Sequence, residues 1–116
     1  MKVSEIVEQT REITRLFDQE VGVWSVEVMV TELVAKVGAL ADSIMIQEGH
    51  RPARPAEPID LEDDIADVLC QLIRLADHYH IDLAQSYQAM LLNTRQKLLA
   101  RLQQQKDQTK RAVRER

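Results

Sequence analysis

Residues 26–44, VEVMVTELVAKVGALADSI, contain the pattern that decides the fold. Their apolar positions follow at intervals of four, three, four, three and four residues: Val26, Val30, Leu33, Val37, Leu40 and Ile44. This spacing keeps the apolar side chains on one face of a helix that packs along another helix at a shallow angle. Ser25, directly before the stretch, is a residue type that caps helix N-termini. The sequence therefore predicts a long amphipathic helix that begins after Ser25.

The same spacing recurs in residues 61–79, LEDDIADVLCQLIRLADHY, behind a second capping residue, Asp60. Its apolar positions are Leu61, Ile65, Val68, Leu72, Leu75 and Tyr79. Between the two stretches, GHRPARPAEP holds all three prolines of the chain, and prolines interrupt helices. We therefore expect the two helices to form an antiparallel hairpin across a proline-rich loop.

Two further helices are expected on either side of this hairpin. The first runs from about Ser4, a possible N-cap, to about Phe17. The other begins after Asp82, which together with Gln85 resembles a capping box. Its apolar positions stop at Leu102. We therefore expect a helical domain over residues 1–102 and a polar, basic tail over residues 103–116 that is either a solvated helix or disordered.

The composition indicates an all-α protein. Hydrophobic residues make up 45% and charged residues 29%, as in ordinary globular domains, but aromatic residues only 3%, with three glycines. Strands favour aromatic residues and need turn residues between them. No apolar run is long enough to cross a membrane, and the amino terminus lacks the apolar core of a secretory signal. With Cys70 as the one cysteine, no internal disulfide can form, so a cytoplasmic location is expected.

The formal charge of −4 is distributed unevenly along the chain. Residues 1–94 carry 7 basic and 17 acidic side chains, whereas residues 95–116 carry 8 basic and 2 acidic ones. The acidic part repels a phosphate backbone and only the basic tail could attract one, so we do not expect a nucleic-acid partner.

Acidic residues are densest in residues 60–68, DLEDDIADV. Asp64 and Asp67 are three residues apart, which places both carboxylates on one helix face, and carboxylate oxygens are the ligands that Mg²⁺ prefers. Alternatively, acids near a helix N-terminus only favour the helix dipole. The dipole explains Glu62 and Asp63 well, but it explains Asp67, two turns into the helix, poorly.

The order of several motifs resembles the MazG-like family of all-α nucleoside triphosphate pyrophosphohydrolases. These motifs are Trp24, the stretch TELVAKVGALADSIM, the stretch LEDDIADVLCQLIRLADHYHIDL, and NTR at residues 93–95. The resemblance covers roughly residues 24–95 and implies a helical bundle that forms dimers or tetramers. It also implies Mg²⁺-dependent cleavage of a nucleoside triphosphate into a monophosphate and pyrophosphate.

The family's metal site consists of a Glu-x-x-Glu pair on the earlier helix and a Glu-x-x-Asp pair on the later one. The later pair carries over as Asp64 and Asp67. The earlier pair does not, because this chain has Lys36 and Ala39 at those positions. The loss of two carboxylates and the gain of a cation predict weakened Mg²⁺ binding.

If the helices pack as in the family, the ammonium of Lys36 faces Asp64 and Asp67 in the place of the cation. Glu32, one turn before Lys36, is then a candidate displaced metal ligand, or alternatively forms an ordinary surface pair with Lys36. If the Lys36 contact is buried, Asp67→Ala should cost on the order of 3 kcal/mol. The resemblance further implies substrate contacts from Asn93 and Arg95, and Lys36 is a third candidate because its charge suits a phosphate.

Two functions therefore stay open for this sequence. The first is a MazG-like nucleotide pyrophosphohydrolase with a weakened or rearranged Mg²⁺ site. The second is an inactive relative that binds nucleotides or serves as a helical interaction module. In both cases we expect a homo-oligomer, dimer or tetramer, because Val34, Ala41 and Met45 form a second apolar stripe that needs a partner surface.

Overall fold

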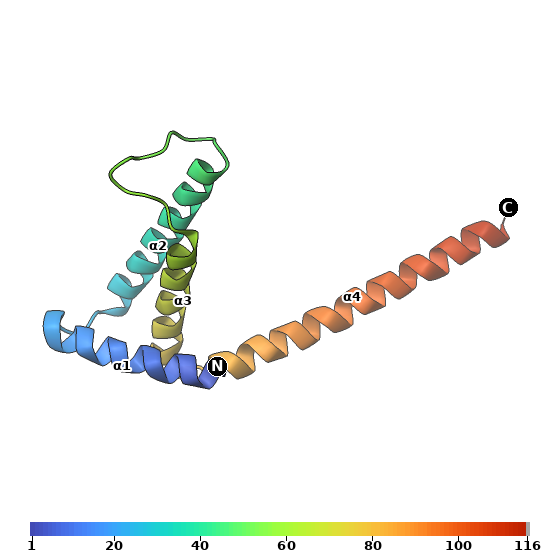
Figure 1. Ribbon diagram of the computed structural model, residues 1–116. Coiled ribbons are helices and arrows are strands. Elements are labelled where there is room, and N and C mark those ends of the chain that lie inside the picture. Colours follow the sequence, from blue (N-terminus) through green and yellow to red (C-terminus); the bar gives the residue numbers. More distant parts are fainter. Residues whose placement is uncertain (116) are drawn as a thin grey trace. The chain divides into compact units, whose positions relative to one another are not determined.

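The computed structural model describes residues 1–115, and these contain four helices and no strand (Figure 1). The helices are α1 (Val3–Val21), α2 (Val26–Gln47), α3 (Leu61–His78) and α4 (Leu83–Arg114). The all-α prediction is therefore confirmed. The chain divides into two compact units, Met1–Ile81 with the first three helices and a second unit that begins at Asp82.

Three of the four helices begin at the residue that the sequence predicts. In each, the side chain of the N-cap accepts a hydrogen bond from a backbone N–H of the first turn: Ser25 from Val28 at 3.3 Å, Asp60 from Asp63 at 3.1 Å, and Asp82 from Gln85 at 3.0 Å. The first helix differs, because Ser4 lies inside α1 and the cap position is Lys2, which makes no side-chain cap bond. The helix also continues past Phe17 and ends before Gly22, whose φ of 88° suits a residue without a Cβ.

α2 and α3 form an antiparallel hairpin, and α1 lies across the end of the hairpin that is remote from the proline-rich loop (Figure 1). Within the described residues, Met29 of α2 and Ile73 of α3 are the buried hydrophobic side chains, 8% and 3% exposed. Neither belongs to a predicted apolar seam. The core of the first unit is therefore small.

The hairpin contact is rotated relative to the predicted seams. The partly or fully covered side chains follow a line through Val26, Met29, Leu33, Lys36, Leu40 and Ser43 of α2, and through Leu61, Asp64, Val68, Gln71 and Leu75 of α3. Half of each predicted seam is exposed instead: Val30, Val37, Ile44, Ile65, Leu72 and Tyr79. The covered line therefore includes polar residues, Lys36 and Ser43 on α2 and Asp64 and Gln71 on α3, beside its apolar ones.

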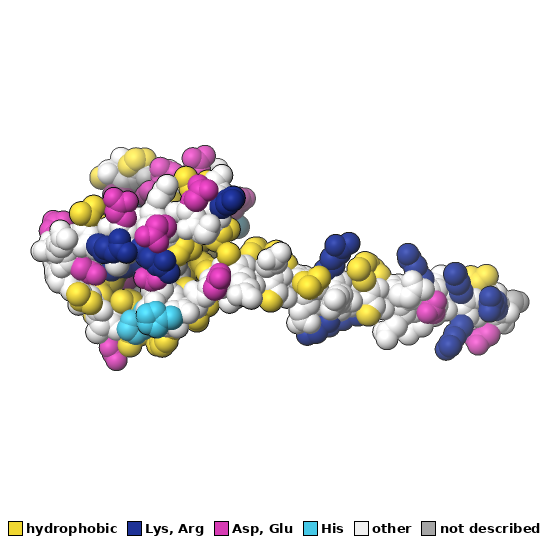
Figure 2. All heavy atoms as spheres, turned by 90° about the horizontal axis from the view of Figure 1, so that it is seen from below, with side chains coloured by type: hydrophobic (Ala, Val, Ile, Leu, Met, Phe, Trp, Pro, Cys, Tyr) yellow, Lys and Arg dark blue, Asp and Glu magenta, His cyan; other side chains and the backbone are white. Residues whose placement is uncertain are grey.

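α4 includes residues 103–114, the greater part of the predicted polar tail, while residue 116 lies outside the described residues. Every residue from 85 to 115 is exposed. Basic side chains recur along the C-terminal part of this helix (Figure 2). Among the residues described, no helix is both long and apolar enough to cross a membrane.

Candidate functional site

The Lys36 ammonium lies between carboxylates of the two hairpin helices. Its Nζ is 3.7 Å from Oε1 of Glu32, one turn earlier on α2, and 3.9 Å from Oδ2 of Asp67 on α3. All three side chains are partly exposed, at 35%, 35% and 42%. The structure thus brings together three predicted site residues, but in a solvated rather than a buried setting.

Three carboxylates at the start of α3 lie within reach of a single ion. Oxygen atoms of Asp63, Asp64 and Asp67 all lie within 4.8 Å of one another. One of them, Oδ2 of Asp64, is buried and has no hydrogen-bond partner among the described residues. Sequence reasoning assigned Asp63 to the helix dipole, although its spacing of four residues from Asp67 also places the two on one face. This cluster fits a cation because an orphaned carboxylate oxygen is an unused ligand.

A cavity of about 260 Å³ lies beside these carboxylates, between α2, the end of the proline-rich loop and the first turn of α3. It is lined by acidic side chains and a single cation: Asp42, Glu57, Asp60, Asp63, Asp64 and Arg54, with Ala39, Ser43, Ile46, Pro58 and Ile59. Ala39 and Asp64 thus line the same cavity from opposite helices. Position 39 therefore lies on the same cavity as Asp63 and Asp64 of α3.

Two arginines of the proline-rich loop neutralise part of this acidic cavity. Arg51 and Arg54 both form ion pairs with Asp42, whose side chain is 20% exposed. Arg54 also pairs with Glu57 at 3.4 Å. Sequence reasoning gave these residues no role. The two arginines of the loop are the only hint of these ion pairs in the sequence. Helical periodicity does not predict the path of a loop, so it could not show that they reach Asp42.

The remaining predicted residues lie elsewhere. Asn93 and Arg95 are exposed residues of α4, in the second unit. Cys70 is half-buried on α3, and burial is the main cause that raises the pKa of its thiol; the nearby Asp67 raises it further and Arg74 opposes the shift. A thiol with a raised pKa is a poor nucleophile, so nothing here favours a catalytic role for Cys70.

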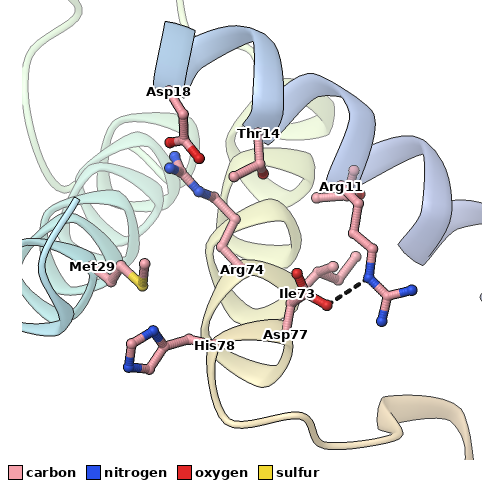
Figure 3. A pocket seen from close by; sticks show the side chains of 9 residues that line it. Arg11, Thr14, Asp18, Met29, Ile73, Arg74, Asp77 and His78 are labelled. Atoms are coloured by element: carbon pink, nitrogen blue, oxygen red, sulfur yellow. Dashed lines mark hydrogen bonds and ion pairs between the residues drawn. The ribbon is translucent and has the colours of Figure 1, made fainter. Parts of the chain in front are cut away.

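A second cluster of charged residues joins α1 to the hairpin (Figure 3). Nε of Arg11 donates a hydrogen bond of 2.5 Å to Oδ1 of Asp77, and this bond is the main cause that raises the pKa of Arg11. Arg74 is 6% exposed, and its guanidinium lies 4.0 Å from the ring centroid of Trp24. These contacts border a cavity of about 180 Å³ between the three helices. The Arg11–Asp77 bond ties α1 to α3, and the Arg74–Trp24 contact ties the segment between α1 and α2 to α3.

Comparisons with protein-family models, with curated proteins and with solved structures gave no match to this chain.

Proposed function

We propose that the chain is a MazG-like nucleotide pyrophosphohydrolase with a weakened divalent-cation site. The observation that supports this best is the position of Lys36, whose ammonium lies 3.9 Å from Asp67 across the hairpin. The resemblance assigns a metal-ligating carboxylate to position 36. If the chain kept the family's helix pairing but lost this ligand, a cationic side chain at position 36 would take the place of the metal ion. The ammonium of Lys36, beside Asp67, fits that expectation.

Asp64 and Asp67 are the residues that would hold Mg²⁺, with Glu32 as a third ligand from α2. The structure adds Asp63, whose carboxylate lies within 4.8 Å of the other two on α3. Bound there, Mg²⁺ would neutralise and orient a triphosphate. A site with four carboxylates carries −4, whereas Asp64, Asp67, Lys36 and Ala39 carry −1 in total. We therefore expect weak Mg²⁺ affinity and slow hydrolysis.

Three residues are proposed for substrate binding: Lys36, Asn93 and Arg95. Arginine and lysine bind phosphate oxygens through charge-assisted hydrogen bonds, and asparagine donates from a neutral amide. The proposed protein is a homo-oligomer, dimer or tetramer, and acts in the cytoplasm, the compartment expected from its single cysteine.

The position of Lys36 also favours a second candidate, a relative without catalytic activity. In that case the lysine serves as a permanent counter-ion for Asp67 and Glu32, and a nucleotide binds to the cationic side chains without a metal ion.

Titration of the full chain with Mg²⁺ or Mn²⁺ in the presence of a panel of nucleoside triphosphates separates these candidates. Slow, metal-dependent release of pyrophosphate supports the hydrolase. Nucleotide binding that needs no metal and releases no pyrophosphate supports the inactive relative. A chain that neither binds nor cleaves any of the nucleotides contradicts both proposals.

Because the Lys36–Asp67 pair is partly exposed, removing it should lower the free energy of unfolding by less than a buried pair would. A buried pair predicted about 3 kcal/mol for Asp67→Ala, but an exposed pair contributes about 1 kcal/mol or less. We therefore expect Asp67→Ala to lower the free energy of unfolding, measured by urea denaturation, by less than about 1 kcal/mol.

Asp42→Ala provides the comparison for this prediction. Its carboxylate is less exposed and pairs with two arginines, so its loss should cost more, about 1–3 kcal/mol. An Asp67 variant that is destabilised more than the Asp42 variant would contradict the solvated setting of the Lys36 pair.

A further inference from the structure

Arg74 of α3 is a buried cation without a paired carboxylate. Its side chain is 6% exposed, and its Nε is buried and has no hydrogen-bond partner among the described residues. Arginines are almost never buried unless they are paired, because removing a charge from water is costly. An unpartnered buried group of this kind is explained when an ion or a small molecule completes its bonding.

The Arg74 side chain borders the cavity of about 180 Å³ between α1, α2 and α3. Figure 3 shows it running from α3 toward Asp18 of α1. Within the group of residues that lines this cavity, an ion pair joins Arg11 to Asp77, but none joins Arg74 to Asp18 or to Asp77 (Figure 3). The wall of the cavity thus contains one paired arginine and one unpaired, buried arginine.

Trp24 fixes the orientation of the unpaired guanidinium. Cζ of Arg74 lies over the indole, 4.0 Å from the ring centroid, where the positive charge is attracted to the face of the ring. Stacking covers a face of the planar guanidinium but leaves the N–H donors along its edge. Two such donors match the two oxygens of a carboxylate or of a phosphate. Arg74 is therefore held in an orientation that suits an oxyanion.

We propose that this cavity binds a small carboxylate, and that Arg74 donates hydrogen bonds to its oxygens. The cavity is smaller than the sites of about 300–1,000 Å³ that hold drug-sized ligands, so it suits a molecule of few atoms. Thr14 contributes a hydroxyl to its wall, and Met29 and Ile73 contribute apolar surface for the carbon end of the ligand. The inference is independent of the proposed nucleotide chemistry, because no residue lines both this cavity and the acidic one.

The acids of the cavity favour a carboxylate over a phosphate. Asp77 is neutralised by Arg11, but Asp18 lines the cavity without pairing with either arginine. Its negative charge repels an anion bound at Arg74, and the repulsion grows with the charge of that anion. A carboxylate carries a single negative charge, whereas phosphate near neutral pH carries more. We therefore expect acetate to bind more tightly than inorganic phosphate.

The test is a titration of the full chain with acetate at constant ionic strength, followed by two-dimensional NMR. The chain has one tryptophan, so the indole N–H of Trp24 gives a single signal beside Arg74, and the backbone amides of Thr14 and Asp18 report from α1. We expect saturable shifts of these signals, with a dissociation constant on the order of 1 mM for so small a ligand. Acetamide, which has a similar shape but no charge, should give no saturable shift.

Three variants assign the binding to Arg74. Arg74→Gln should weaken acetate binding by at least roughly tenfold, because the charge-assisted hydrogen bonds are lost. Asp18→Asn should tighten it by roughly threefold or more, because it removes a like charge and keeps a similar shape. Arg15→Gln is the matched control, since it removes the same charge at a side chain that is 66% exposed and outside the cavity. It should bind acetate as the parent does.

Several results would overturn the proposal. Shifts that do not saturate, or equal shifts with acetate and acetamide, would show that the cavity has no carboxylate site. Acetate binding that survives Arg74→Gln, or that Arg15→Gln weakens as much, would exclude Arg74 as the binding residue. Tighter binding of phosphate than of acetate would contradict the ligand class. If circular dichroism shows that Arg74→Gln loses helix content, Asp18→Asn decides, and unchanged or weaker acetate binding by that variant would contradict the site.

Discussion

A Lys36→Glu, Ala39→Glu double variant is expected to bind Mg²⁺ at least roughly tenfold more tightly than the parent chain, and to gain pyrophosphohydrolase activity. The change moves the charge of positions 36, 39, 64 and 67 from −1 to −4. Position 36 lies across the hairpin from Asp67, and Ala39 lines the same cavity as Asp64. New carboxylates at these two positions would therefore approach the existing ones from the opposite helix.

Isothermal titration calorimetry with Mg²⁺, followed by a pyrophosphate assay, measures both gains. Lys36→Gln with Ala39→Gln is the control, because it removes the lysine and adds similar bulk without adding a negative charge. A Glu variant that keeps its helix content but binds Mg²⁺ no better than the Gln variant would show that positions 36 and 39 do not face the acids of α3. Fast Mg²⁺-dependent turnover by the parent chain would instead favour Glu32 as a displaced ligand.

Ile73→Ala is expected to lower the free energy of unfolding by about 2–5 kcal/mol. Ile73 is 3% exposed and borders the cavity between α1 and α3. The small core offers few other side chains that could move into the space left behind. A loss of this size is a large share of the roughly 5–15 kcal/mol that stabilises an ordinary domain.

Urea denaturation followed by circular dichroism measures this loss. Ile13→Ala, at a residue of α1 that is 49% exposed, is the matched control and should cost less than about 1 kcal/mol. Equal effects of the two substitutions would contradict the packing of α1 against α3.

The local features of the fold could be predicted from the sequence because they depend on neighbouring residues. Ser25, Asp60 and Asp82 cap their helices as expected, since an N-cap bonds within its own first turn. The hairpin follows from two stretches of equal spacing with prolines between them. Periodicity did not reveal which part of each apolar stripe is covered, because a helix with a broad apolar stripe can turn about its axis at little cost.

The burial of Ile73 could not be predicted from the apolar pattern of its own helix. The seam predicted for α3 passed through Leu72 and Leu75, one and two residues from the side chain that is actually buried. Ile73 is covered because α1, more than 50 residues earlier, lies across α3. Among the site residues, the facing of Lys36 and Asp67 could be predicted from the resemblance. The pairing of Asp42 with Arg51 and Arg54 could not, because it depends on the path of the proline-rich loop.

The exposure of residues 85–114 of α4 has a consequence for how that part of the chain moves. A helix whose side chains are exposed is held mainly by its own backbone hydrogen bonds, and these open and close by helix–coil fluctuations on a scale of roughly 0.1–1 μs. The amide protons of residues 85–114 would therefore exchange with solvent by local fraying, while those beside Ile73 and Arg74 would exchange only when the first unit unfolds.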